Sequence, residues 1–396
     1  MKIPTRILPV IVISQFCCTS LWFAGNGVMN ELVEAFSLQP SALGHLTSSV
    51  QFGFISGTLV FAMLTIADRF SPSIVFFVCA LFGAACNLAM VLDGNLFPSL
   101  LLERFLTGFF LAGIYPVGMK IASDYFEKGL GVSLGYLVGA LVVGTAFPHL
   151  VKGFTTAMPW KVVLIVTTSL AVIGGLLMLL FVPNGPHRKQ GQPVKWSAFF
   201  SVFQKREFRS AAFGYFGHMW ELYAFWAFVP VMLSTYLVLH PDQNLNIPIL
   251  TFAIIGVGGL SCVAGGYLSE WMGTKRTAAM FLFLSGLCCL FSPLFFLMDE
   301  SLFFILFLMF WGIAVIADSP LFSTLVGQHA IPELKGTAFT IVNCVGFSIT
   351  IASIQLLTLL SPKVNPSYLY LILAGGPLLG LIGLLGKKKS AQASIT

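Results

Sequence analysis

Long apolar stretches, separated by short polar or Pro/Gly-rich breaks, run along the whole chain. A helix that crosses a bilayer needs roughly 20 mostly apolar residues, which is about the length of these stretches. The pattern therefore predicts an all-α polytopic membrane protein with twelve transmembrane helices. The predicted helices cover residues 7–29, 42–67, 73–92, 96–120, 130–150, 161–183, 209–237, 246–269, 276–297, 301–325, 336–360 and 367–386.

The longest polar segment follows the sixth predicted helix. It predicts a cytoplasmic linker loop, residues 184–208, that joins an N-terminal six-helix bundle, 1–183, to a C-terminal six-helix bundle, 209–396.

Two local echoes indicate that the halves are internal repeats. Asp68 lies 202 residues before Glu270, which stands in a similar loop. Tyr115 lies 204 residues before Ser319, and both of these residues are followed by Pro. Many transporters are built from two repeats, with the substrate site near the midplane between them.

Composition supports a membrane location, because only 9% of the residues are charged and 57% are hydrophobic. A soluble domain carries charge at about a quarter of its positions. So apolar a chain needs lipid as the solvent for most of its surface, which excludes a soluble enzyme or a nucleic-acid-binding module.

Basic residues predict the orientation. If both chain ends lie on one side of the membrane, that side holds 17 basic residues and the other side three. Cytoplasmic loops carry the excess of Lys and Arg, so we expect both termini in the cytoplasm of a bacterial inner (plasma) membrane. The 17 are Lys2, Arg6, Arg69, Lys120, Lys128, Arg188, Lys189, Lys195, Lys205, Arg206, Arg209, Lys275, Arg276, Lys335 and Lys387 to Lys389.

The loop after the eighth predicted helix, from Gly266 to Arg276, is similar to the G-x-L-a-D-r-x-G-r-[KR] motif of the major facilitator superfamily, with Glu270 in place of Asp. The matching loop of the first half keeps Asp68 and Arg69. The resemblance implies that Asp68, Arg69, Glu270, Lys275 and Arg276 act as latches of the cytoplasmic gate.

The fourth predicted helix resembles another motif of that family, R-x-x-x-G, through Arg104 and Gly108. In the family this buried Arg is linked to proton coupling. The fifth helix has spaced glycines but lacks the Gly-Pro pair of the antiporter motif, which favours uptake over efflux. The residues around His218 and Asp318 look like those of a bacterial predicted-permease subgroup, and the family's usual form is a monomer.

Four of the ionisable side chains inside predicted helices stand out, namely Arg104, His218, Glu221 and Asp318. Each costs a few kcal/mol at bilayer depth, so each is a functional candidate. We expect Arg104 to pair with a carboxylate or an anionic substrate. His218 and Glu221 are three residues apart on one helix, so they can share a proton. The alternative for all four is a purely structural role.

Asp318 precedes Pro320 by two residues, where a broken helix can expose carbonyl groups to a cavity. Other polar and aromatic residues at midplane depth are further site candidates, although most aromatic residues of so Phe-rich a chain pack against helices or lipid. These candidates are Gln15, Gln51, Asn343, Tyr215, Trp220, Tyr223, Trp226 and Trp311.

The leading interpretation is a proton-coupled carrier of a small polar or anionic organic solute, working by alternating access. The alternatives are a drug or sugar efflux antiporter, a metal-ion carrier using His45, His149, His218, Met219 and Glu221, and a non-transporting membrane sensor or enzyme. We expect no cofactor and no catalytic residues, because no catalytic or P-loop motif is present.

Overall fold

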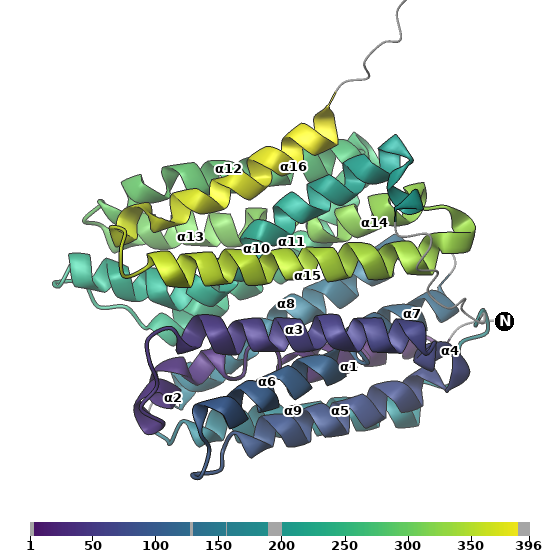
Figure 1. The fold of residues 1–396 in the computed structure, drawn as a ribbon, viewed down its shortest axis with the longest axis horizontal. Helices are drawn as coiled ribbons and strands as arrows, with labels where there is room; N and C mark the ends of the chain where they lie inside the picture. Colours follow the sequence, from purple (N-terminus) through teal and green to yellow (C-terminus); the bar gives the residue numbers. More distant parts are fainter. Residues whose placement is uncertain (1–3, 127–129, 156, 189–199, 387–396) are drawn as a thin grey trace, which may run out of the picture.

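The computed structural model describes residues 4–126, 130–155, 157–188 and 200–386, and within these ranges the chain is all-helical (Figure 1). The helices of the N-terminal half are α1 (Ile7–Thr19), η1 (Asn26–Val28), α2 (Met29–Ala35), α3 (Ala42–Met63), α4 (Ile66–Arg69), α5 (Pro72–Ala89), α6 (Phe97–Leu111), α7 (Tyr115–Tyr125), α8 (Leu130–Phe154) and α9 (Lys161–Phe181).

The helices of the C-terminal half follow in the described residues after 200. They are η3 (Ser201–Phe203), α10 (Arg206–Leu239), α11 (Ile247–Met272), α12 (Thr274–Phe296), α13 (Ser301–Ala314), α14 (Ser319–His329), η4 (Pro332–Leu334), α15 (Lys335–Leu360), η5 (Pro366–Ala374) and α16 (Gly375–Leu385).

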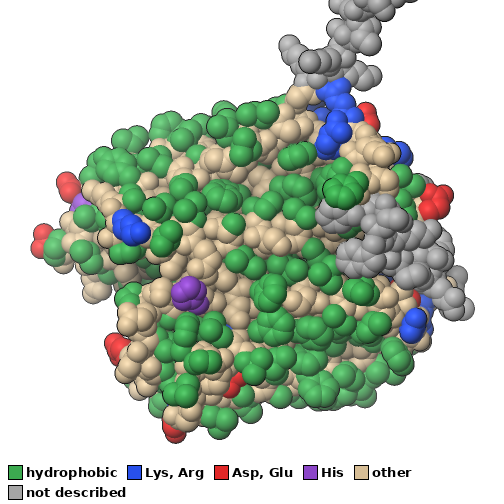
Figure 2. Space-filling view, in the orientation of Figure 1, with side chains coloured by type: hydrophobic (Ala, Val, Ile, Leu, Met, Phe, Trp, Pro, Cys, Tyr) green, Lys and Arg blue, Asp and Glu red, His purple; other side chains and the backbone are tan. Residues whose placement is uncertain are grey.

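These elements form twelve transmembrane spans, as predicted. Eleven helical segments are long and apolar enough to cross a membrane, and the shorter apolar α1 begins the remaining span. Figure 2 shows hydrophobic side chains over the long flanks and charged side chains gathered at the two short ends. Such a surface fits hydrocarbon along the flanks and water at the ends.

The two halves lie side by side and touch along two helix pairs, α8 with α11 and α3 with α15 (Figure 1). The first pair crosses at Gly139 and Gly259. A Cβ on Gly139 would lie 2.8 Å from the carbonyl oxygen of Gly259, so only glycine allows this backbone approach. Close crossings through small residues are a common way to join helices in membranes.

Three spans are broken rather than continuous. The predicted ranges 7–29, 96–120 and 301–325 run through these breaks, although a broken helix was expected at Pro320. The fourth span is interrupted between α6 and α7, and the tenth between α13 and α14. Pro116 and Pro320 lie in the first turn after each break, because proline suits the start of a helix and lacks the N–H that a helix interior needs. The two breaks are 204 residues apart, so the sequence echo marks a repeated structural feature.

The first span breaks without proline. α1 ends at Thr19, and turns lead through Gly25 to η1. The hydroxyls of Thr19 and Ser20 donate to the carbonyls of Gln15 and Cys17, at 2.8 and 2.7 Å. Side-chain hydroxyls that bond to preceding carbonyls compete with the backbone ladder and bend helices.

The expected linker lies partly outside the described residues, since 189–199 are not described. α10 begins at Arg206, slightly before the predicted 209. The basic residues Lys2, Lys128, Lys189, Lys195 and Lys387 to Lys389 also lie outside the described ranges. The exact boundaries of the two bundles stay a prediction.

The glycine crossing yields a matched pair of substitutions in α8. Gly139→Ala should lower the melting temperature in detergent, because overpacking at a backbone contact costs about 1–3 kcal/mol. Gly135→Ala, one turn earlier, should be neutral or stabilising, because its Cβ would meet nothing closer than 3.8 Å. Equal melting temperatures for the two variants would contradict the crossing.

Candidate functional site

Glu221 lies fully buried near the middle of α10, where its carboxylate accepts three hydrogen bonds. The indole N–H of Trp311 on α13 donates to Oε1 at 2.6 Å, and the hydroxyl of Ser285 on α12 donates to Oε2 at 2.8 Å. The thiol of Cys289 donates to Oε1 at 3.3 Å. Two helices of the C-terminal half, α12 and α13, therefore hold this acid with three neutral donors.

His218 pairs with Asp318, and not with Glu221 as predicted. Its Nδ1 lies 2.8 Å from Oδ1 of Asp318, and both side chains are buried. At this separation the two groups form an ion pair whenever the imidazole is protonated. Nε2 of His218 has no hydrogen-bond partner among the described residues. The expectation that His218 and Glu221 share a proton is thus wrong, because each bonds to a different helix.

Asp318 occupies the break of the tenth span, directly before α14. The repeat offset of 204 residues places Ile114 at the same position in the first half, directly before α7. Both halves therefore have the break, but only the second carries an acid there. The break expected at Pro320 is present, and it presents a carboxylate to α10.

Arg104 is buried on α6 and serves the break of the first span. Its Nη1 donates to the carbonyl of Leu21 at 3.0 Å, and its Nη2 donates to the carbonyl of Trp22. None of its partners among the described residues is a carboxylate, so the expected pairing with a carboxylate is absent, while pairing with an anionic substrate stays a prediction. A guanidinium fork binds two neighbouring acceptors well, and here it satisfies carbonyls that the broken helix leaves free.

Aromatic rings from both halves pack together at the centre of the bundle. Trp22, at the first break, has its ring centroid 4.8 Å from Phe54, 5.7 Å from Tyr223 and 5.8 Å from Phe347. Tyr223 in turn lies 5.2 Å from Trp226. All five side chains are buried, so these rings close the space between the halves.

Two predicted polar residues, Gln15 on α1 and Gln51 on α3, are buried with amide atoms that have no hydrogen-bond partner among the described residues. Another predicted pair does meet, since the hydroxyl of Tyr215 donates to Oδ1 of Asn343 at 3.2 Å. Trp220 instead donates to the carbonyl of Ile372 at 3.2 Å. Tyr215, Asn343 and Trp220 therefore have hydrogen-bond partners, whereas the amides of Gln15 and Gln51 have none among the described residues.

The latch of the first half is formed with a partner that the sequence analysis missed. Asp68 binds Lys120 of α7 at 2.9 Å, and Lys120 also lies 3.5 Å from Asp124. Nη2 of Arg188 donates to the carbonyls of Asp68 and Phe70 at 2.8 and 2.7 Å. This cluster ties the loop after α3 to α7 and to the segment after α9.

The other predicted latch residues do not make the expected contacts. Nε of Arg69 donates to the hydroxyl of Thr65 at 3.1 Å, within its own loop. Glu270 is exposed, and among the described contacts it makes no ion pair with Lys275 or Arg276. Both basic residues line a cleft of about 530 Å³ instead. The contacts expected of a second latch are therefore not made among the described residues.

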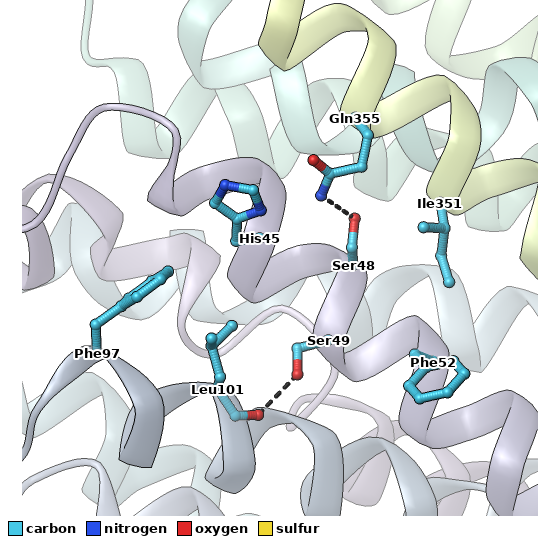
Figure 3. Close-up of a pocket in the computed structure, with 8 residues that line it drawn as sticks. All are labelled: His45, Ser48, Ser49, Phe52, Phe97, Leu101, Ile351 and Gln355. Carbon is cyan, nitrogen blue, oxygen red and sulfur yellow. Dashed lines mark hydrogen bonds between the residues drawn. The ribbon is translucent and has the colours of Figure 1, made fainter.

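A crevice of about 360 Å³ lies between the halves at the end opposite the chain termini. Figure 3 shows Gln355 of α15 reaching toward Ser48 of α3, with His45 and Phe97 nearby. Nε2 of Gln355 donates to the hydroxyl of Ser48 at 2.8 Å and to the carbonyl of Gly44 at 3.0 Å. These bonds join the two halves at this end.

Several of the functional contacts involve residues that the sequence analysis did not select, chiefly Trp22, Lys120, Ser285, Cys289 and Gln355. Ser285 and Cys289 are four residues apart and share a face of α12, a signal visible only once Glu221 is known to lie opposite. Within the described residues no group of three His, Cys, Asp or Glu side chains could hold a metal ion.

The role of Arg104 can be tested by Arg104→Lys. A single ammonium cannot reproduce the two-pronged contact, and one unsatisfied buried carbonyl costs about 1–3 kcal/mol, so the melting temperature should fall. Arg209→Lys, at an exposed Arg that also donates to a carbonyl, should change stability by less than about 0.5 kcal/mol. An unchanged melting temperature for Arg104→Lys would show that Arg104 does not hold the break.

The contact between α3 and α15 can be tested by cross-linking. A Cβ on Gly44 would lie 2.9 Å from Cβ of Thr358, so Gly44→Cys with Thr358→Cys needs only a small separation to form a disulfide. Oxidation should link these two peptides, detected by mass spectrometry. Gly44→Cys with Thr350→Cys, about two turns away, should remain unlinked. The opposite result would place the helices in a different register.

The fold and these contacts can be compared with known proteins. A sequence model of the Major Facilitator Superfamily matches residues 11–354. No curated protein matches the chain in sequence.

Solved structures match over nearly the full length. A bacterial homologue of the human lysosomal transporter Spinster, inward-facing and unoccupied, is 16% identical with a TM-score of 0.66, covering 97% of this chain and 96% of that one. The human organic anion transporter MFSD10 (TETRAN) is 15% identical with a TM-score of 0.75, covering 97% of this chain and 100% of that one. At these identities the similarity concerns the fold, while the family match covers most of the sequence. The chain belongs to the Major Facilitator Superfamily.

Proposed function

We propose that this chain is a secondary active transporter that moves a small polar or anionic organic solute across a bacterial inner membrane in symport with protons. In this proposal a monomer works by alternating access, with both termini in the cytoplasm. The names of the two similar structures, a lysosomal transporter homologue and an organic anion transporter, support solute transport. The proposal assigns no chemical reaction to the chain.

The observation that carries proton coupling is the buried His218–Asp318 pair. Ionisable groups inside a membrane bundle commonly form proton relays. An apolar pair of similar size would stabilise the bundle at least as well as a buried ion pair, so a structural role alone does not explain why these groups are buried. Taking up or releasing a proton changes the net charge of this pair. The change falls at the break between α13 and α14, where a helix can bend.

Glu221 offers a second proton-accepting site on the same helix, one turn away from His218. Its three donors come from α12 and α13, whereas His218 faces the break before α14. Protonation of Glu221 would cancel the negative charge that these donors hold. We infer that Glu221 and Asp318 contact different neighbouring helices. A change in the protonation of either acid can therefore be coupled to helix movement within the C-terminal half.

The coupling is tested with protein in liposomes that have an inward-directed proton gradient and are placed in a mixed metabolite extract. A gradient of about 2 pH units is worth about 2.8 kcal/mol per proton, enough for about 100-fold accumulation. Mass spectrometry should find a solute concentrated by the unmodified chain. Asp318→Asn should lower the accumulation ratio to about one, because an amide can neither take up a proton nor balance the charge of a protonated His218.

Asp299→Asn is the control, because Asp299 is an exposed acid whose contact with His240 is 3.5 Å. It should keep full accumulation. Glu221→Gln tests the second acid in the same assay. Accumulation that persists after the proton gradient is collapsed would refute proton coupling and leave facilitated transport or another ion as the driving mechanism.

A further inference from the structure

The rings that close the centre of the bundle come from opposite halves. Trp22 belongs to the first half, and its ring plane lies 24° from that of Phe347 in the second half. Phe54 of α3 lies 4.5 Å from the same Phe347, and Trp22 lies 5.7 Å from Tyr223. Each of these rings therefore contacts a ring of the other half, and the Trp22–Phe347 pair is stacked.

Opening the bundle separates these faces, because alternating access moves one half against the other. Large aromatic faces that lose their partners are left to water, which is unfavourable. A flat solute lying between the separated rings would restore the contact on both sides. In the closed bundle, the rings of one half occupy the position in which such a solute would contact the rings of the other half.

The same region carries buried polar atoms that have no partner among the described residues. They are the indole N–H groups of Trp22 and Trp226 and the amides of Gln15 and Gln51. Gln51 precedes Phe54 by about one helical turn, and Trp226 adjoins Tyr223 at 5.2 Å. The amide oxygen of Gln15 lies directly against Gly118 of α7. A buried unpartnered polar group is costly, so these groups are suited to bonding a solute.

The charged groups nearby already have partners. The guanidinium of Arg104 donates to two backbone carbonyls, His218 is paired with Asp318, and the carboxylate of Glu221 accepts three hydrogen bonds. The unpartnered groups of Trp22, Trp226, Gln15 and Gln51 are neutral donors and acceptors.

We propose that the transported solute is neutral and planar, with an aromatic or heteroaromatic ring and an amide-like edge, and that it binds between Trp22 and the rings of Tyr223 and Phe347. The indole and glutamine groups bond its edge. This inference rests on the proposed transport function and narrows its substrate from polar or anionic solutes to neutral planar ones.

The test uses pairs of probes that share a ring and differ in charge, nicotinamide with nicotinate and benzamide with benzoate. Ligand that binds the native state raises its melting temperature by mass action. In purified protein, the neutral member of at least one pair should raise the melting temperature in a concentration-dependent way, and the carboxylate should not.

Two variants locate the binding. Gln51→Leu removes only an unpartnered amide, so it should fold normally, yet it should weaken binding of the neutral probe by about tenfold, the loss of one hydrogen bond. Trp22→Leu should abolish binding. Trp271→Leu is the matched control, because Trp271 is 88% exposed, and it should leave binding unchanged.

Stabilisation by the carboxylates instead of the amides would overturn the inference, as would binding that is unaffected by both Gln51→Leu and Trp22→Leu. Stabilisation by none of the neutral planar probes would also overturn it. The liposome assay separates this failure from failure of the proposed function, because gradient-driven accumulation of a different solute would leave transport standing.

Discussion

Hydrocarbon offers no hydrogen-bond partner, so each backbone carbonyl that a broken helix releases must find one inside the bundle. This constraint explains the position of the buried arginine of the first half. Arg104 is buried because the carbonyls of Leu21 and Trp22 need donors, and its two-pronged contact holds the bent first span against α6. The bend in turn places Trp22 at the contact between the halves. An ionisable side chain thus supports the position of an aromatic one.

The two halves share their architecture but not their chemistry. Both the fourth and the tenth spans break before a proline, and the breaks keep the repeat offset. Ile114 stands at the first break and Asp318 at the second. Glu221 and Asp318, the acids buried within the spans of the C-terminal half, have no counterpart at the break before α7, while the buried Arg104 of the N-terminal half bonds the backbone.

The two ends of the bundle are held by different forces. At the end opposite the termini, Gln355 joins α15 to α3 through hydrogen bonds between the halves. At the end where α1 begins and α16 ends, the Asp68–Lys120 contact lies within the first half, and no matching ion pair of Glu270 is found among the described residues. Between the two ends lie the aromatic contacts. Movement of one half against the other therefore has to separate the helix pairs α8–α11 and α3–α15 and the rings between the halves, but has to break few polar bonds.

The sequence by itself determined the class of protein, the twelve spans, the repeat and the short list of buried ionisable residues. Apolar length and charge placement act along one helix at a time, so they can be read from the chain. Prolines mark two of the three breaks, because the effect of a proline is also local to its own helix. The predicted ranges nevertheless ran through all three breaks. The break after Thr19 has no proline and depends on hydroxyl and glycine residues that occur elsewhere in unbroken helices.

Only the tertiary structure decided the partners. Spacing along α10 suggested that His218 pairs with Glu221, but the two side chains bond to different helices, α13 and α12 for Glu221 and the break before α14 for His218. Arg104 found carbonyls more than 80 residues away instead of a carboxylate. The energy of a buried polar group depends on the nearest donor or acceptor in space, and helix crossings set that distance. Local sequence can identify which residues need a partner, whereas the packing of the helices selects it.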